Sequence, residues 1–292
     1  MPRGFHWLTA AQFCSALADN ALLIVTLAVL QERQLSPWLA PMLKFGFTLA
    51  YVVLAPFIGP LADAVPKGRL MAWMNALKLA GALALLAGLH PVAAFAVVGL
   101  GAAAYAPAKY GLVTELVPAR QLVAANGWLE VSVVAAVLLG TASGGALVSQ
   151  LWLQGPAAAL AAPLGLSALQ VSLLAVMGVY ALAALLNRGV PDSGARYPAP
   201  ARHPLRLTRE FMRDNRTLWR DREGGLSLAA TTIFWGVGAT LQFVVLRWAV
   251  ECMGLALSQA ALLQGVVALG VVAGATAAGR WVPLAAAPRL LG

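Results

Sequence analysis

Long apolar runs dominate this sequence and limit what it can fold into. Each run is close to the roughly 20 residues that an α-helix needs to cross a bilayer. Eight such runs cover residues of about 5–30, 41–63, 70–89, 92–114, 122–148, 166–187, 225–250 and 258–282. They do not alternate as β-barrel strands do, and a backbone in hydrocarbon must satisfy its own hydrogen bonds. The sequence therefore predicts an all-α polytopic membrane protein.

The composition indicates a surface that faces lipid. Hydrophobic residues make up 61% of the chain and charged residues only 11%, whereas a soluble domain carries about 25% charged residues. Membrane lipids are therefore expected partners. The formal net charge of +9 would suit a nucleic acid, but the excess is mainly Arg in the loops between apolar runs. We expect no nucleic-acid partner.

The basic loops also predict the orientation, because Lys and Arg concentrate in cytoplasmic loops. With the N-terminus inside, the outer loops hold Arg33, and Arg247 lies near an outer helix end. The inner side then holds Arg3, Lys67, Arg69, Arg120, the 188–223 segment, Arg280 and Arg289. This bias predicts a multi-pass protein with a cytoplasmic N-terminus.

Residues 188–223 form the one long polar segment. Its first part, residues 191–204, is rich in Pro and small residues, and a helix is expected from Thr208, a residue type that often caps helices. The apolar face of this helix would hold Leu207, Phe211, Leu218 and Trp219, with Arg209, Arg213, Arg216 and Arg220 around it. Such a helix is expected to lie on the cytoplasmic membrane surface, and a solvated linker helix without a ligand is the simpler alternative.

Six spans, a basic inner linker and further spans are the layout of a transporter built from two six-helix halves. The expected domains are a six-helix transmembrane bundle (1–187), a basic cytoplasmic linker with an amphipathic helix (188–223) and the first two helices of an incomplete C-terminal bundle (224–292). A complete second half would need about four more spans, so the sequence is expected to be truncated.

Polar residues inside the first and third spans are the leading candidates for function. An ionisable group in hydrocarbon costs roughly 2.5–3.5 kcal/mol on insertion scales, and so such a group faces a partner, a bundle interior or water. Asp19 and Asn20 lie in the first span, where the acid would bind a proton, a cation or a cationic headgroup. Asn75 and Lys78 share a face of the third span. Either Asp19 or Glu130 would serve as the anion for Lys78.

The fourth and fifth spans add further candidates. Lys109 follows Pro107, which removes a helical hydrogen bond, and would either reach a phosphate or extend to the interface. Asn126 and Glu130 share a face of the fifth span. In the same span, Gly140 and Gly144 form a small-xxx-small pair that is more typical of close helix packing than of binding.

A short charged loop joins the second and third spans. Gly59 and Asp63 end one apolar run, and Lys67, Gly68 and Arg69 open the next. An ion pair between Asp63 and Lys67 or Arg69 would latch one conformational state, since alternating access needs a contact that can break. A plain tight turn is the alternative.

The sequence shows no pattern of a soluble enzyme or a bound cofactor. The histidines, His6, His90 and His203, do not cluster, and Cys14 and Cys252 make no disulfide framework. No phosphate-binding Gly-rich loop or nucleophile elbow is present. We therefore expect no enzyme, no cofactor and no metal.

Several of these segments together resemble one transporter family. The loop motif resembles that of the major facilitator superfamily, and the whole set resembles the lysophospholipid transporters of Gram-negative inner membranes. The most specific segments are Asp19-Asn20 and Pro107-Ala108-Lys109-Tyr110-Gly111, with Asn75…Lys78 and Ala125-Asn126-Gly127…Glu130 beside them.

The resemblance implies a function and a site. Members of that family flip lysophospholipids, notably lysophosphatidylethanolamine, from the outer to the inner leaflet, where an acyltransferase partner restores the second chain. It implies the bacterial inner membrane as location, with Asp19 facing the ammonium group and Lys109 or Lys78 facing the phosphate. Asn20, Asn75, Asn126 and Glu130 would complete the polar path for the headgroup.

Two other hypotheses remain open from the sequence. One keeps the fold and changes the cargo to a drug or metabolite, with export coupled to protons through Asp19 or Glu130. The other is an inactive truncated remnant that has no transport of its own.

Overall fold

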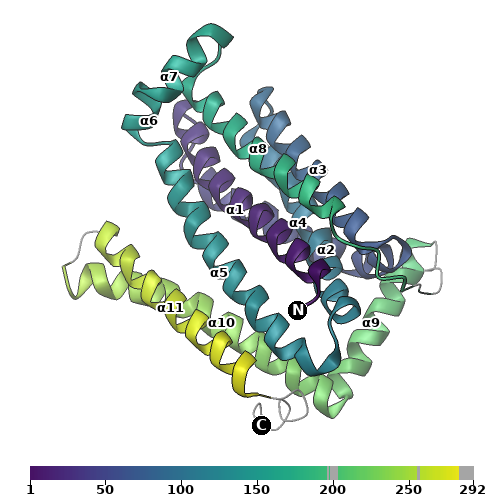
Figure 1. Ribbon diagram of the computed structural model, residues 1–292. Helices are drawn as coiled ribbons and strands as arrows, with labels where there is room; N and C mark the ends of the chain where they lie inside the picture. The colour runs from purple at the N-terminus through teal and green to yellow at the C-terminus, as the bar shows by residue number, and fades with distance from the viewer. Residues whose placement is uncertain (196, 198–202, 255–256, 283–292) are drawn as a thin grey trace. The chain divides into compact units, whose positions relative to one another are not determined.

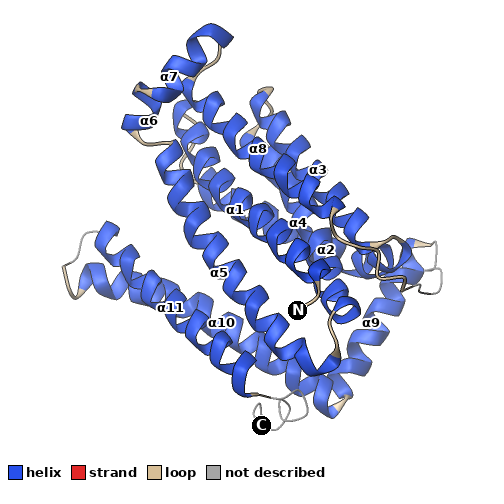
Figure 2. Cartoon of the chain, viewed as in Figure 1, coloured by secondary structure: helices blue, strands red, loops and turns tan. Residues whose placement is uncertain are grey.

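The computed structural model describes residues 1–195, 197, 203–254 and 257–282. These residues form helices joined by loops (Figure 2). The long helices are α1 (Arg3–Glu32), α2 (Leu39–Ala64), α3 (Lys67–Leu86), α4 (Pro91–Leu116), α5 (Leu122–Leu147), α8 (Ala168–Arg188), α9 (Pro204–Arg220), α10 (Arg222–Glu251) and α11 (Leu257–Trp281). The short ones are η1 (Ala119–Gln121), α6 (Gln150–Gln154), α7 (Pro156–Ala161) and η2 (Ala162–Leu164). The all-α prediction is confirmed.

Six of the eight expected spans are long and apolar enough to cross a membrane. They are α1, α2, α3, α4, α5 extended by η1, and α8, and their mean hydropathy runs from 1.2 to 2.1. The other two expected spans coincide with α10 and α11, which have 30 and 25 residues. Several side chains of these two helices lie outside the described residues, among them that of Arg247.

The chain divides into two compact units, and one of the points where they join lies inside α5. The first unit contains residues 1–118 and 135–204, and the second contains residues 119–134 and 205–292. The three-part division at residues 187 and 223 remains a prediction. Residues 283–292, which end its third part, lie outside the described residues.

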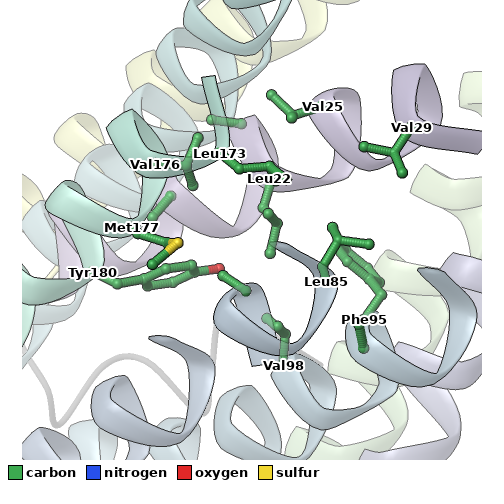
Figure 3. Packing of buried hydrophobic residues seen from close by; sticks show 14 of the residues in the cluster. Leu22, Val25, Val29, Leu85, Phe95, Val98, Leu173, Val176, Met177 and Tyr180 are labelled. Carbon is green, nitrogen blue, oxygen red and sulfur yellow. The ribbon is translucent and has the colours of Figure 1, made fainter. Parts of the chain in front are cut away.

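Helices α1, α2, α3, α4 and α8 pack together in the first unit (Figure 1). Helix α1 lies against α8, α3 lies against α4 and α8, and α2 lies against α4. On α1, buried Leu22, Val25 and Val29 recur every three or four residues, which places them on one face of a helix. Figure 3 shows this face meeting Leu85 of α3 and Val176 of α8.

Several helix boundaries differ from those expected. Helix α2 continues to Ala64 and α3 begins at Lys67, so the loop between them is only Val65 and Pro66. The charged residues of that loop motif therefore lie in the last turns of α2 and the first turn of α3. A search for apolar runs does not assign these residues to helices, because helical turns at the membrane surface are polar. The expected cap at Thr208 is wrong. Helix α9 begins at Pro204, since the fixed φ of proline suits the first turn of a helix.

The second unit contains α9, α10, α11 and the beginning of α5. Asp221 separates α9 from α10, and its carboxylate accepts a hydrogen bond from the Gly224 amide at 2.8 Å. That contact is an N-cap, which satisfies a free amide in the first turn of α10. Helices α10 and α11 pack against each other.

Gly140 and Gly144 lie where α5 comes very close to α1 within the first unit. A Cβ atom at Gly140 would lie 2.5 Å from the Leu17 carbonyl oxygen, and one at Gly144 would lie 2.9 Å from the Cα atom of Ala21. Real Cβ atoms do not approach backbone atoms this closely, so both positions need the small residue that the sequence pattern indicated.

Gly144→Ala is therefore expected to destabilise the protein, because backbone atoms of α1 must move to admit the methyl group. Overpacking of this kind costs roughly 1–3 kcal/mol, and the thermal unfolding temperature in detergent measures the loss. Gly145→Ala is the matched control, since a Cβ at Gly145 has no atom within 4 Å. Equal unfolding temperatures for the two variants would contradict the tight contact.

Candidate functional site

A buried polar network joins α1, α3 and α8 in the middle of the first unit. The Lys78 ammonium group forms an ion pair with Asp19, with 2.7 Å between Nζ and Oδ2. The second carboxylate oxygen of Asp19 accepts a hydrogen bond from the Tyr180 hydroxyl at 2.8 Å. Of the two anions that the sequence left open for Lys78, the structure selects Asp19.

The network continues from Lys78 to two neutral groups. Lys78 Nζ donates to the Ser15 hydroxyl at 2.9 Å, and that hydroxyl donates to Asn75 Oδ1 at 2.6 Å. Ser15, Asn75 and Lys78 are 1%, 0% and 2% exposed. These contacts follow from helical spacing, because Ser15 and Asp19 are four residues apart and Asn75 and Lys78 are three apart.

Helix α4 closes over Lys78 because it has a glycine at the crossing. A Cβ atom at Gly101 would lie 2.8 Å from both Lys78 Cγ and the Met74 carbonyl oxygen. The ring of Tyr105, one turn further along α4, lies 5.2 Å from Lys78 Nζ. A cation at this distance from an aromatic face is attracted by the ring. Lys78 is thus enclosed by an acid, a hydroxyl and an aromatic ring.

Some buried polar atoms around the network have no hydrogen-bond partner among the described residues. They include Gln12 Nε2, Asn75 Nδ2 and the Tyr105 hydroxyl. Gln12 is one helical turn from Ser15, and the Tyr105 hydroxyl lies near the side chains of Asn187 and Asn75. Buried polar groups normally have partners, so these atoms give the network capacity to bind a polar group of a ligand.

The other predicted binding residues lie at other positions on α1, α4 and α5. Asn20 donates to the Ala16 carbonyl oxygen of its own helix at 2.8 Å. Lys109 is buried on α4, which continues unbroken past Pro107 to Leu116, and its Nζ lies 4.3 Å from the Tyr110 ring centroid. Asn126 and Glu130 lie on the part of α5 that belongs to the second unit, where Asn126 is exposed and Glu130 is half-buried.

A second charged cluster lies at the α2–α3 loop, where Lys67 links two acids. Its Nζ is 3.5 Å from Asp63 Oδ1 and 2.5 Å from Glu115 Oε1. Of the two cations that the sequence offered to Asp63, the structure selects Lys67. The stronger partner of Lys67 is Glu115, at the end of α4, which sequence reasoning did not assign to the latch.

Glu115 also holds the chain that follows α8. Its carboxylate accepts hydrogen bonds from the Ser193 hydroxyl at 2.5 Å and from the Tyr197 hydroxyl at 2.8 Å. The hydrogen bond to Glu115 raises the pKa of Tyr197, and the Tyr197 ring lies 4.4 Å from Lys67 Nζ. Three segments distant in sequence therefore meet at one carboxylate.

The remaining loop residues take other positions. A Cβ at Gly68 would lie 3.2 Å from Val190 Cβ, so Gly68 permits the chain after α8 to pass close to α3. Gly59 lies on α2 with no atom within 4 Å of a Cβ built there, and Arg69 is exposed. Arg69 forms no ion pair with the described residues.

Comparison with known proteins identifies the family. The sequence matches the Major Facilitator Superfamily over residues 8–291. It is also 43% identical to the lysophospholipid transporter LplT of Yersinia pestis (strain Pestoides F) over 292 residues, which is 100% of this chain and 68% of that relative. The LplT proteins of Yersinia pseudotuberculosis strains YPIII (serotype O:3) and PB1/+ (serotype IB) match with the same identity and coverage.

The chain belongs to the lysophospholipid transporter family of the Major Facilitator Superfamily. The resemblance noted from its motifs is thereby confirmed, and so is the superfamily fold class. Membership of the lysophospholipid transporter family also means a multi-pass membrane protein, and it points to a transporter rather than to an enzyme.

Sequence reasoning did not assign Tyr180, Tyr105 and Glu115 to either cluster. Of these, Tyr180 gave the clearest signal in the sequence, because it is a polar group inside the apolar run of α8.

Proposed function

We propose that the protein moves lysophospholipids from the outer to the inner leaflet of a bacterial inner membrane by alternating access. The relatives that match the whole chain at 43% identity carry the name lysophospholipid transporter. The observation that carries the proposal is the ion pair of buried Lys78 and half-buried Asp19, with spare hydrogen-bonding groups around it. A pair of opposite charges complements a zwitterionic headgroup.

The pair can exchange partners with such a headgroup. Without substrate, Asp19 and Lys78 neutralise each other, which limits the cost of holding two charges in the bundle. A headgroup that brings both an ammonium and a phosphate can take over each contact, with Asp19 binding the ammonium and Lys78 binding the phosphate. No charge is then left unpaired at any stage of this exchange.

The other predicted polar residues remain part of the proposed path. Lys109 is an alternative partner for the phosphate, and Asn20, Asn75, Asn126 and Glu130 would bind the headgroup at other stages of its passage. The acyl chain would meet the apolar side chains that dominate the transmembrane helices. Among these residues Lys109 is the best candidate for binding the headgroup, because it is only 8% exposed and lies on α4, which also supplies Tyr105.

The proposed orientation places the N-terminus and the α2–α3 loop in the cytoplasm, following the distribution of Lys and Arg. The cluster of Asp63, Lys67 and Glu115 then lies on the inner side and would break when the inner side opens. Gly59, Gly68 and Arg69 belong to the same proposed latch, as parts of the loop motif. An inner-membrane acyltransferase is the expected consumer of the delivered lysophospholipid.

A leaflet-resolved assay tests the function directly. The protein is reconstituted in vesicles with fluorescent lysophosphatidylethanolamine, and the fraction of label protected from a membrane-impermeant quencher is followed with time. Protein-dependent movement of the lysolipid, with no movement of the diacyl lipid, is the expected result. Lysolipid movement at the rate of protein-free vesicles would refute the proposal.

A proton uncoupler separates this function from proton-coupled export of a drug or metabolite. Export driven by a proton gradient through Asp19 or Glu130 stops when the gradient is removed. Lysophospholipid movement down its own gradient is expected to continue under the uncoupler. A collapse of lysolipid movement under the uncoupler would favour the proton-coupled mechanism.

A further inference from the structure

A groove lies between α3 and α8 in the first unit. Its volume is about 760 Å³, which falls inside the roughly 300–1,000 Å³ that ligand sites occupy. Its lining includes Trp73 and Leu185, which are 51% and 56% exposed. The groove is therefore open along its side, where a membrane protein meets lipid.

Small and apolar residues form most of the groove wall. Ala72 and Ala76 of α3 face Ala181 and Ala184 of α8 across it. Methyl side chains project little from the two helices, so this part of the groove wall is apolar and leaves room between α3 and α8. No water-soluble ligand gains from such a wall, whereas an acyl chain packs well against it.

The end of the groove near the α2–α3 loop is charged. Arg69 in the first turn of α3 and Arg188 at the end of α8 both line it, and neither forms an ion pair or hydrogen bond with the described residues. Asp192 lines the same end, and its Oδ1 accepts a hydrogen bond from the Gly194 amide at 3.0 Å. Two guanidinium groups thus outnumber one carboxylate, which favours an anion.

The first turn of α3, which contains Arg69, favours an anion at this end. It has no side-chain cap, and the positive end of that helix dipole adds to the attraction for a phosphate. Asn187 also lines the groove, but it is 2% exposed and its side chain lies close to the Tyr105 hydroxyl, so it is not assigned to the lipid.

We propose that this groove binds one phospholipid with an anionic headgroup. The phosphate lies between Arg69 and Arg188, and one acyl chain lies along the alanines. Trp73 is one helical turn from Arg69, and Trp residues are common at the level of the lipid headgroups. This lipid is distinct from the cargo. The site depends on the proposed function only in one respect, which is that the orientation assigns the lipid to the inner leaflet.

Native mass spectrometry of the purified protein in detergent tests this site without any transport step. With phosphatidylglycerol as the probe, one lipid is expected to bind per protein, more tightly than phosphatidylethanolamine or phosphatidylcholine. Arg69→Gln with Arg188→Gln is expected to weaken this binding about tenfold or more, because both charge-assisted hydrogen bonds to the phosphate are lost.

Matched variants make the result specific. Arg120→Gln with Arg209→Gln removes the same charge from two exposed arginines outside the groove and is expected to leave phosphatidylglycerol binding unchanged. Ala76→Trp keeps both groove arginines but fills the hollow, and it is expected to weaken binding as much as the double variant does. Glycerol 3-phosphate at the same concentration is expected not to compete.

Three outcomes would overturn the proposal. If the variant with Arg69→Gln and Arg188→Gln retained as much lipid as the variant with Arg120→Gln and Arg209→Gln, the lipid would bind elsewhere. Undiminished binding by Ala76→Trp would mean that the groove holds no chain. Full competition by glycerol 3-phosphate would identify a site for a free anion. None of these measurements depends on whether lysophospholipid moves between leaflets, so the two proposals fail separately.

Discussion

Asp19→Asn is expected to abolish lysophospholipid movement and to lower the stability of the first unit. The substitution keeps the size of the side chain but removes the charge that Lys78 Nζ contacts at 2.7 Å. Lys78 is 2% exposed, so it has no water to replace the lost anion. Breaking a buried ion pair by removing one partner costs about 3–5 kcal/mol. The thermal unfolding temperature and the leaflet assay measure the two effects.

Lys78→Met, alone and combined with Asp19→Asn, separates a scaffold from a transport path. Removing both charges leaves no buried ion unpaired, so the double variant is expected to recover most of the stability that either single variant loses. Transport is expected to stay absent in all three variants, because the headgroup then lacks one or both of its counter-charges. Normal lysolipid movement by Asp19→Asn, or transport that returns with stability in the double variant, would remove the pair from the proposed path.

Glu115→Gln is expected to release the chain after α8 and so to weaken the proposed latch. The substitution removes the anion that contacts Lys67 at 2.5 Å and accepts hydrogen bonds from Ser193 and Tyr197. Lys67 retains only Asp63, at 3.5 Å. Hydrogen bonds to charged groups contribute about 1.5–3 kcal/mol each, so the loss of even one strongly shifts the balance between the bound and released states of the chain.

Labelling of a cysteine placed in that chain measures the release. Ala195→Cys, in a background without Cys14 and Cys252, would report accessibility to a water-soluble maleimide. A shift of about 1–2 kcal/mol corresponds to a roughly 5- to 30-fold change in population, and labelling in Glu115→Gln is expected to rise accordingly. Glu32→Gln, an exposed acid on α1, is the control. Labelling rates that agree between the two variants would argue against Glu115 as the centre of the latch.

The helical spans were predictable because each long apolar run satisfies its backbone within itself. Their type and approximate position follow from local sequence alone, and the six that the structure supports confirm this. Helix ends were less predictable. The first turn of α3 contains Lys67 and Arg69, and a hydrophobicity pattern assigns such residues to a loop although they are helical.

The candidate site was predictable as a list of residues but not as an arrangement. A charged residue in hydrocarbon stands out whatever its neighbours are, so Asp19 and Lys78 were found directly. The sequence could not choose between Asp19 and Glu130 as the partner of Lys78. That choice depends on which faces of α1, α3 and α5 meet, which is a property of packing between residues far apart in the chain.

The amino-acid sequence by itself determined that this protein contains a bundle of membrane helices, and which ionisable residues it places inside them. These are local properties, set by apolar length and by the cost of a charge in lipid. Only the tertiary structure decided that Tyr180 binds Asp19 and that Glu115 joins Lys67 to the chain after α8. Such contacts join residues up to 161 positions apart. Their formation depends on how the helices cross, which the local pattern of any one helix does not contain.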